Sequence, residues 1–340
     1  AMEPLKEYFL EIEFRLKKKR GLLKAGHLVA WEQLPLVNYE TILLSSKDSF
    51  STVDENAPTI DSVIESDDKI EIRGKDLEMV FSKKSGTIES LVANGNDHII
   101  NGPRPNFWRN PTDNDYGNGM ARRSSVWKGA SENQTISDTK MIKGDVFVGI
   151  RVSIEYPDIA SSGEISYNIY GDGRIIVTHK FEPDRESLPN LPKFGMRMTI
   201  PKEYDDFTWF GNGPHESYWD RKASSRVDVF SGKVSEQYHP YVRPQENGNK
   251  TDVRWATLRN EMGHGIMITG LLSLNASHFV PEDYDDGFII DRSDGNMKAR
   301  RDKKSMHTTD LKESDIIHLD IDHLQMGVGG EDSWGAQPLA

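Results

Sequence analysis

Residues 146–154 read VFVGIRVSI, and this stretch decides the fold class. Every second residue, from Val146 to Ile154, is valine or isoleucine. Because successive side chains of a strand point to opposite faces, such alternation predicts a strand with one buried face. No part of the chain shows a sustained apolar period near 3.6 residues, which argues against a parallel α/β fold.

The next stretch, residues 165–177, reads ISYNIYGDGRIIV. Two alternating runs flank Gly171-Asp172-Gly173, which is typical of a β-hairpin. Similar strands are predicted at residues 29–36, 40–44, 70–72, 77–81, 255–258, 266–269 and 317–321. Short strands at this spacing predict an all-β fold, a large antiparallel β sandwich.

The chain is predicted to contain two units of unequal size. Residues 10–16 alternate like a strand, and the segment from Ser45 to Asp68 is polar and rich in Ser, Asp and Glu. A polar segment of this kind is typical of a linker. The predicted organisation is a small β unit at residues 2–46, a linker at 47–67 and a large domain at 68–340.

Composition excludes several functional classes. The 340 residues include 42 Lys and Arg against 54 Asp and Glu, a net charge of −12, which argues against nucleic-acid and anionic-membrane partners. The absence of cysteine excludes disulfides, thiolate metal sites and cysteine nucleophiles. The most apolar stretch, residues 265–272, is far shorter than the roughly 20 residues of a spanning helix. Charged residues interrupt the first twenty positions, so no signal peptide is predicted and a cytoplasmic location is expected.

The spacing of the acidic and glycine-rich loops departs from known metal and nucleotide motifs. Counted from Asp113, an EF-hand loop would need glycine at position 6 and glutamate at position 12, but Asn118 and Ser124 stand there. Residues 283–287 fail the same test. Residues 211–216 and 327–330 each lack the last glycine of a dinucleotide fingerprint. Neither an EF-hand nor a nucleotide site is predicted, and an irregular cation site at either acidic loop stays open.

Aromatic and polar residues cluster at residues 105–109, 218–221 and 333–335. Sugar sites combine such groups, because a pyranose has an apolar face and a polar rim. Tryptophan in a β sandwich is usually part of the core, which is expected for Trp108 and Trp219. Trp334 differs, because it lies in a glycine-rich acidic segment where burial is less expected.

Four longer stretches resemble the C-terminal domain of the β-galactosidases of glycoside hydrolase family 2. They occur in the family's order and read NFWRNPTDND (106–115), GNGPHESYWDR (211–221), YVRPQENG (241–248) and MGVGGEDSW (326–334). Residues 25–27 and 30–33 resemble the end of the immunoglobulin-like domain that precedes it. The resemblance covers most of the chain.

The resemblance implies a galactose mutarotase-like super-sandwich from residue 68 onward and a partial immunoglobulin-like domain at 2–46. Family members usually continue past Pro338, so the large domain is expected to be truncated at its end. The two catalytic glutamates of the family lie in a TIM barrel that has no counterpart here. The same holds for the family's Mg and Na sites, so the chain is expected to carry no cofactor. The expected partners are that barrel and a β-galactoside such as lactose, and self-association into a homo-oligomer stays open.

Two elements of the resemblance shape the substrate site. The family tryptophan that stacks on the sugar corresponds to Trp334. A mobile loop that closes over the active site, with a hinge glycine at Gly117, corresponds to Tyr116, Gly117, Asn118, Gly119, Met120, Ala121, Arg122 and Arg123. Beyond Gly117 the residues depart from the family, which leaves the contacts of a closed loop undefined.

Two other functions remain open from the sequence. One is a stand-alone carbohydrate-binding protein with the same sandwich. The other is an aldose mutarotase, which would need an acid–base pair at the anomeric carbon. His215 and Glu246 are the candidates for that pair.

Overall fold

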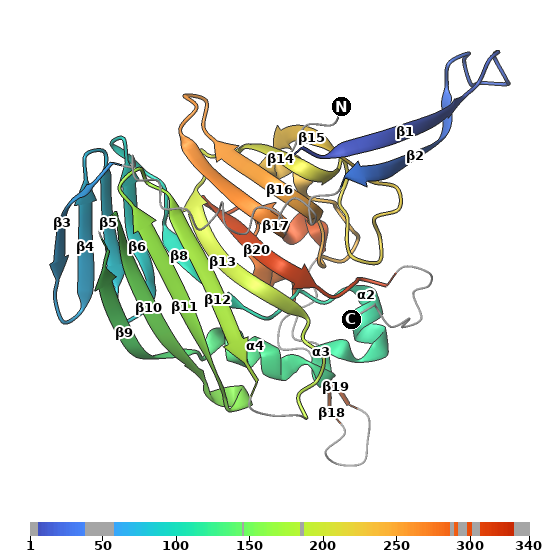
Figure 1. The fold of residues 1–340 in the computed structure, drawn as a ribbon. Helices are drawn as coiled ribbons and strands as arrows, with labels where there is room; N and C mark the ends of the chain where they lie inside the picture. Colours follow the sequence, from blue (N-terminus) through green and yellow to red (C-terminus); the bar gives the residue numbers. More distant parts are fainter. Residues whose placement is uncertain are drawn as a thin grey trace. The chain divides into compact units, whose positions relative to one another are not determined.

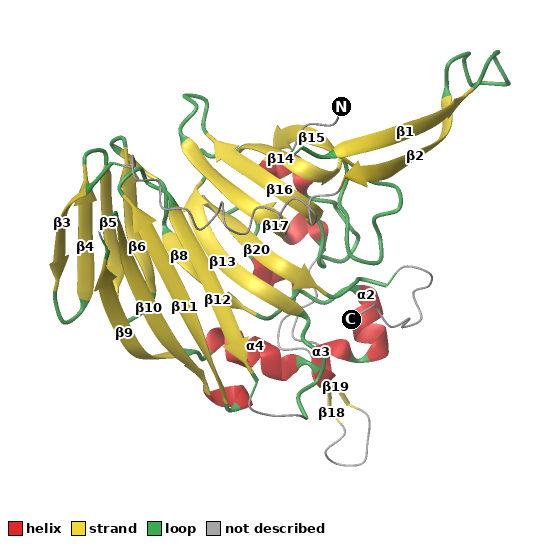
Figure 2. Cartoon of the chain, in the orientation of Figure 1, coloured by secondary structure: helices red, strands yellow, loops and turns green. Residues whose placement is uncertain are grey.

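The computed structural model describes residues 6–37, 58–144, 146–183, 187–285 and 307–329, together with the backbone of two short strands at 289–291 and 298–300. The contacts divide the chain into two units, residues 1–54 and 55–340. Antiparallel strands predominate (Figures 1 and 2), which confirms the all-β prediction. No described helix has the length and apolar content needed to cross a bilayer.

The first unit contains one antiparallel hairpin, β1 (Tyr8–Arg15) with β2 (Leu28–Val37). Both strands were predicted, whereas the strand expected at 40–44 lies outside the described residues. Apolar side chains of the hairpin are exposed, including Phe14 at 62%. A lone two-stranded hairpin is marginally stable in water. The assignment of residues 2–46 to a partial immunoglobulin-like domain stays a prediction.

The second unit contains a five-stranded sheet and a seven-stranded sheet, with β6 beside β8 (Figure 1). The first has the order β3 (Ile60–Glu65), β4 (Lys69–Gly74), β5 (Leu77–Ser82), β6 (Thr87–Ala93) and β7 (Asn96–Asp97). The second has the order β15 (Arg226–Lys233), β14 (Asp206–Gly213), β16 (Lys250–Arg259), β17 (Gly265–Ser277), β20 (Ile316–Gln325), β13 (Lys193–Pro201) and β8 (Asn101–Asn106).

A four-stranded sheet faces the five-stranded one. Its order is β12 (Ile175–Glu182), β11 (Ser161–Tyr170), β10 (Phe147–Tyr156) and β9 (Thr135–Lys143). The predicted hairpin at Gly171-Asp172-Gly173 is present, with Ile169 opposite Ile175. A separate pair joins β18 (Ile289–Asp291) to β19 (Lys298–Arg300).

The apolar core lies between these facing sheets. Ile150 and Val152 of β10 are at most 1% exposed. Across the layer, the rings of Phe81 on β5 and Tyr167 on β11 meet edge to face, with centroids 5.1 Å apart. The alternation that predicted β10 therefore arises because one face of the strand supplies this core.

Strand β3 changes the predicted domain boundary. It lies within residues 47–67, which were expected to be a linker, and Val63 pairs with Ile72 of β4. The sheet therefore begins at Ile60 rather than at residue 68. Its start is less apolar than the other strands, which is why composition placed it in the linker.

Helices occupy one segment that the sequence analysis did not predict, α2 (Asp113–Asn118), α3 (Met120–Arg123) and α4 (Ser125–Glu132). Each is too short to give a sustained helical period. In α4, Trp127 and Ala130 are three residues apart and are both buried. Single 3-10 turns are η1 (Pro157–Ile159), η2 (Val234–Gln237), η3 (Pro281–Tyr284) and η4 (Thr308–Asp310).

Candidate functional site

The four stretches that carry the resemblance converge in the second unit. The first leads from β8 into α2, where Thr112 is the N-cap residue. The Asp115 carboxylate accepts hydrogen bonds from the Thr112 amide at 2.7 Å and from Arg109 Nη2 at 2.8 Å. Arg109 and Asp115 are both fully buried. This capping box fixes the direction in which residues 116–123 leave the sheet.

The described part of the fourth stretch, residues 326–329 after β20, is fixed by the first and second stretches. The Val328 carbonyl accepts hydrogen bonds from Asn114 Nδ2 at 3.1 Å and from Thr112 Oγ1 at 3.4 Å. The amides of Val328 and Gly329 donate to the two carboxylate oxygens of Asp220 at 3.0 and 2.9 Å. The described chain up to Gly329 is therefore held from both sides.

The second and third stretches are joined through Glu216. Its carboxylate accepts hydrogen bonds from the Tyr241 hydroxyl at 2.6 Å and from the Gly248 amide at 2.7 Å, and it pairs with Arg221. A further contact joins the third stretch to α2, because the Arg243 guanidinium lies 4.0 Å from the centre of the Tyr116 ring. All four stretches thus form one connected group, here called the loop cluster.

Glu246 lies below the surface of the loop cluster. It is 5% exposed and accepts hydrogen bonds from Asn275 Nδ2 at 3.2 Å and from the Tyr218 hydroxyl at 3.4 Å. Burial raises the pKa of Glu246, and Lys193 and Arg109 offset part of this effect. A carboxyl group enclosed in this way is placed to support the loops rather than to meet a substrate.

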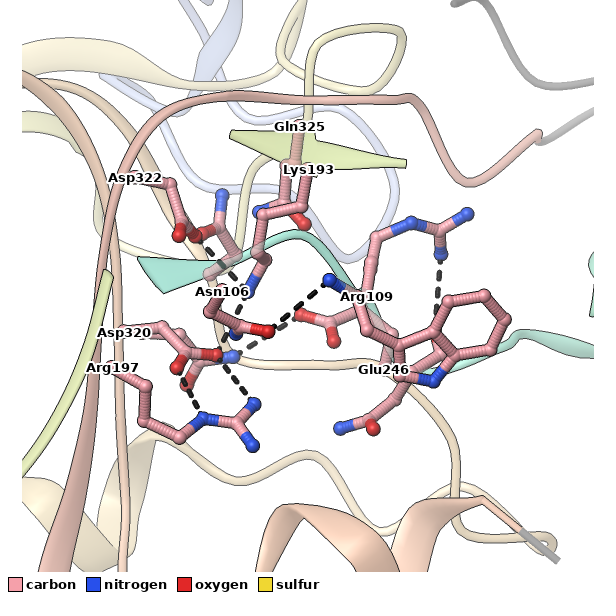
Figure 3. Close-up of polar contacts among 12 residues, drawn as sticks. Asn106, Arg109, Lys193, Arg197, Glu246, Asp320, Asp322 and Gln325 are labelled. Atoms are coloured by element: carbon pink, nitrogen blue, oxygen red, sulfur yellow. Dashed lines mark hydrogen bonds and ion pairs between the residues drawn. The ribbon is translucent and has the colours of Figure 1, made fainter. Parts of the chain in front are cut away.

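An ion cluster of Lys193, Arg197, Asp320 and Asp322 lies beside Glu246 (Figure 3), and all of its members except the half-buried Arg197 are buried. Lys193 Nζ lies 2.8 Å from Asp320 Oδ2 and 3.1 Å from Asp322 Oδ2. Arg197 Nε donates to Asp320 Oδ1 at 2.6 Å. Figure 3 shows these side chains pointing toward one another from β13 and β20.

In the ion cluster, burial and the attraction between opposite charges shift the pKa values in opposite directions. Burial opposes the charge of Asp320, but Arg197 and Lys193 outweigh it and lower the pKa of Asp320. For Asp322 burial prevails and raises the pKa. Burial also opposes the charge of Lys193, but Asp320 and Asp322 outweigh it and raise the Lys193 pKa. One lysine is therefore shared between two carboxyl groups of unequal acidity.

Sequence reasoning missed this cluster. The alternation of Ile317, Leu319 and Ile321 suggested that the intervening residues face solvent, yet Asp320 and Asp322 are buried. A signal was available, because Lys193 and Arg197 are four apart and therefore lie on one face of a strand. These two basic residues can pair with the two acidic residues of β20. The sequence alone does not show this, because it does not reveal that β13 and β20 are neighbours.

The structure describes only part of the predicted substrate site. Trp334 lies outside the described residues. The segment from Tyr116 to Arg123 forms the end of α2 and all of α3, rather than an irregular loop. Gly117 lies within α2, whereas Gly119, with φ of 77°, separates the two helices. Tyr116 is buried, and its hydroxyl donates to Asp285 Oδ1 at 3.4 Å.

The two sandwich tryptophans differ. Trp108 is 7% exposed, which confirms its predicted place in the core. Trp219 is 49% exposed, so the same prediction was wrong for this residue. It lies in a tight turn between Tyr218 and Arg221, with Lys222 Nζ 5.0 Å from its ring centre. A turn residue has no facing sheet to cover it.

The proposed mutarotase pair is not brought together by any contact of the described chain. His215 is exposed, and its Nδ1 lies 2.9 Å from the Glu216 carbonyl oxygen. No hydrogen bond joins it to Glu246, whose partners within residues 187–285 are Tyr218 and Asn275.

The described residues offer no group of three or more His, Asp or Glu side chains arranged to hold a metal ion. Asp113 and Asp115, which begin the acidic stretch, bind protein groups instead. Asp113 contacts Arg243 and Gln245, and Asp115 pairs with Arg109. Both carboxylates at the start of that stretch are therefore engaged by protein groups.

Two family profiles match the sequence. The profile described as "Beta galactosidase small chain" matches residues 73–340, and that described as "Beta-galactosidase, domain 4" matches residues 1–37. Together the two matches follow the division between the first and second units.

Three β-galactosidases are similar to this chain over most of its length. A β-galactosidase of Priestia megaterium is 34% identical over 333 residues, which cover 97% of this chain and 30% of the relative. Those of Lactobacillus delbrueckii subsp. bulgaricus and Streptococcus thermophilus are 31% and 29% identical, over 80% and 81% of this chain. The chain spans about 30% of the length of the first of these relatives and 25% of the other two.

Proposed function

Because the chain belongs to the β-galactosidase small-chain family, we propose that it is a non-catalytic module of a retaining β-galactosidase of glycoside hydrolase family 2. The parent enzyme would hydrolyse terminal β-D-galactosides such as lactose. The observation that carries the proposal is the loop cluster, because it joins four separated stretches of the family pattern into one connected group.

The role of the module is to shape the mouth of an active site. A sugar ring presents an apolar face, on which Trp334 would stack. The loop cluster fixes the chain up to Gly329, five residues before that tryptophan. It also fixes the start of α2, from which residues 116–123 would move over the substrate. Both elements would therefore be supplied to the barrel from a single rigid base.

The catalytic carboxylates would come from the TIM barrel of the parent. A retaining glycosidase needs two carboxyl groups about 5 Å apart, with access to the glycosidic bond. Glu246 is enclosed and Glu216 is occupied by Tyr241, Arg221 and the Gly248 amide. The Mg and Na sites of the family would lie in the barrel as well.

The first test is a proton NMR time course of the chain with lactose and freshly dissolved α-galactose. We expect no cleavage and anomer exchange at the rate of the buffer alone. Cleavage of lactose would overturn the non-catalytic role. Accelerated anomer exchange would favour an aldose mutarotase, with His215→Gln and Glu246→Gln as the variants to examine.

The second test is Trp334→Ala in the complete enzyme. Loss of a stacking anchor should weaken substrate binding by about 1–3 kcal/mol, seen as a higher KM for lactose. Met262→Ala, at a residue that is 75% exposed in a hairpin turn, is the matched control. An unchanged KM in the Trp334 variant would contradict the proposed stacking role.

A further inference from the structure

A cavity of about 310 Å³ lies between β8, β13, α4 and η3, here called the α4 pocket. Trp108 and Asn110 line it after β8, Lys128 lines it from α4, and Asp285 closes it after η3. The volume is at the lower end of the range of small-molecule sites, which suits a ligand of about one sugar ring. The role proposed above makes no use of this cavity.

The walls of the α4 pocket are already held in place. Asp285 Oδ2 accepts hydrogen bonds from Trp108 Nε1 at 3.1 Å and from Lys128 Nζ at 2.9 Å. Arg197 Nη1 donates to Glu282 Oε1 at 3.1 Å while its Nε remains bound to Asp320. Side chains that are fixed before binding lose little conformational entropy when a ligand arrives.

Asn110 is the polar group of the lining that is most readily available to a ligand. It is 8% exposed and lines the cavity, yet its side-chain amide makes no hydrogen bond to any other described residue. Its amide atoms are not among the fully enclosed, unpartnered polar atoms of the described residues, so they are open to the cavity and can bind a ligand there. An amide offers both a donor and an acceptor, and a pair of neighbouring hydroxyl groups can satisfy both.

The charges of the lining select the class of ligand. Arg104, Lys128 and Arg197 are balanced by an equal number of acidic residues, Glu132, Glu282 and Asp285. An anion or a cation would thus gain no net attraction from the formal charges of the lining. A neutral ligand with many hydroxyl groups can instead accept from the basic groups and donate to the acidic ones.

We propose that the α4 pocket is a binding site for a neutral monosaccharide. Trp108, Pro105 and Met198 supply apolar surface beside these polar groups, as a pyranose requires. The site uses the stretch at 105–109, where the sequence combines aromatic and polar residues. It is argued from the cavity alone and does not depend on the role proposed for the loop cluster.

The test is a titration of the chain with D-galactose, followed by saturation-transfer difference NMR. We expect saturable binding that Asn110→Leu, a change that keeps the branched shape but removes the amide, weakens by about tenfold or more. Arg104→Ala, at the exposed rim, should weaken it too, without risk to the core. Arg73→Ala, at an exposed residue of β4 outside the pocket, should leave the affinity unchanged.

A second control separates this site from the loop cluster. Binding should persist in Trp334→Ala, and D-galacturonate should bind no more tightly than D-galactose. Absence of saturable binding, or equal affinity in the wild type, Asn110→Leu and Arg104→Ala, would overturn the proposal. Binding lost only in Trp334→Ala would also overturn it, because the sugar would then occupy the loop cluster.

Discussion

The sandwich core and the ion cluster both contain side chains that water does not reach, but the two regions differ in chemistry. Ile150 and Val152 in the core are 1% and 0% exposed, and Lys193 and Asp322 in the ion cluster are 1% and 0% exposed. Burial stabilises the core because apolar surface leaves water. In the ion cluster the removal of charged groups from water is unfavourable, and the attraction between paired groups offsets it.

The comparison teaches that burial alone does not define what a residue contributes. Apolar residues of similar size can replace one another with a moderate loss of stability, because the hydrophobic effect has no preferred direction. The ion cluster instead depends on the alignment of β13 with β20, where Arg197 is opposite Asp320. We therefore expect the ion cluster to fix strand register beneath the loop cluster, and the core to supply most of the stability.

The largest effect is expected from Lys193→Met. The change leaves Asp320 and Asp322 buried beside each other without their shared cation, which should lower the free energy of unfolding by about 3–5 kcal/mol. Urea unfolding followed by tryptophan fluorescence measures it. Lys202→Met removes a surface lysine that is 42% exposed and should stay within about 0.5 kcal/mol of the wild type.

A double variant sharpens this result. Lys193→Met combined with Asp322→Leu removes the enclosed carboxyl group that would have lost its lysine. It should recover part of the lost stability, because apolar replacements of buried ion pairs are often tolerated. If Lys193→Met alone matched Lys202→Met, the ion cluster would not be the constraint described here.

The next effect concerns a polar residue within the apolar region. His179 stacks on Phe194 with ring centroids 4.8 Å apart, and burial lowers its pKa to about 4 from the ordinary 6.5. Between these pH values the unfolded chain binds a proton that the folded chain does not. Stability should therefore fall as pH decreases from 6.5 to 4, by at most about 1.4 kcal/mol per pH unit for this one proton.

His179→Phe should remove that part of the acid sensitivity. Urea midpoints at pH 7 and pH 5 would differ less in the variant than in the wild type. His215→Phe, at an exposed histidine, is the matched control and should keep the wild-type difference. An unchanged pH dependence in His179→Phe would show that other groups control acid unfolding.

The smallest effect is expected from Thr112→Ala in the loop cluster. Loss of the N-cap hydroxyl should lower the free energy of unfolding by about 1 kcal/mol. Thr112→Ser keeps the hydroxyl and should be nearly neutral. The Val328 carbonyl retains Asn114 as a donor in both variants. A loss as large as that of Lys193→Met would mean that the cap, rather than the ion cluster, holds this region together.

Local patterns predicted the strands well and the polar interior poorly. β10, β11 and β12 were predicted because each has alternating residues and a clear turn. The short helices after β8 were missed, because fewer than three turns give no readable period. Trp219 was wrongly placed in the core, since sequence alone does not distinguish a turn from the strand beside it.

The loop cluster could be anticipated only through the family resemblance. Thr112 and Val328 are 216 residues apart, and no local pattern relates two such positions. The ion cluster was missed for the same reason, since Lys193 and Asp320 are separated by 127 residues. Long-range strand pairing, which single-residue preferences do not encode, brings both groups together.

The hydrogen bonds between Asp220 and the segment after β20 also restrict which residues positions 220 and 327 can hold. A methyl group added at Gly327 would come within 2.2 Å of the Asp220 carboxylate, which is itself fixed by the Val328 and Gly329 amides. Neither position can therefore change freely while the other is kept. In natural variation and in mutant libraries alike, positions 220 and 327 should change together or not at all.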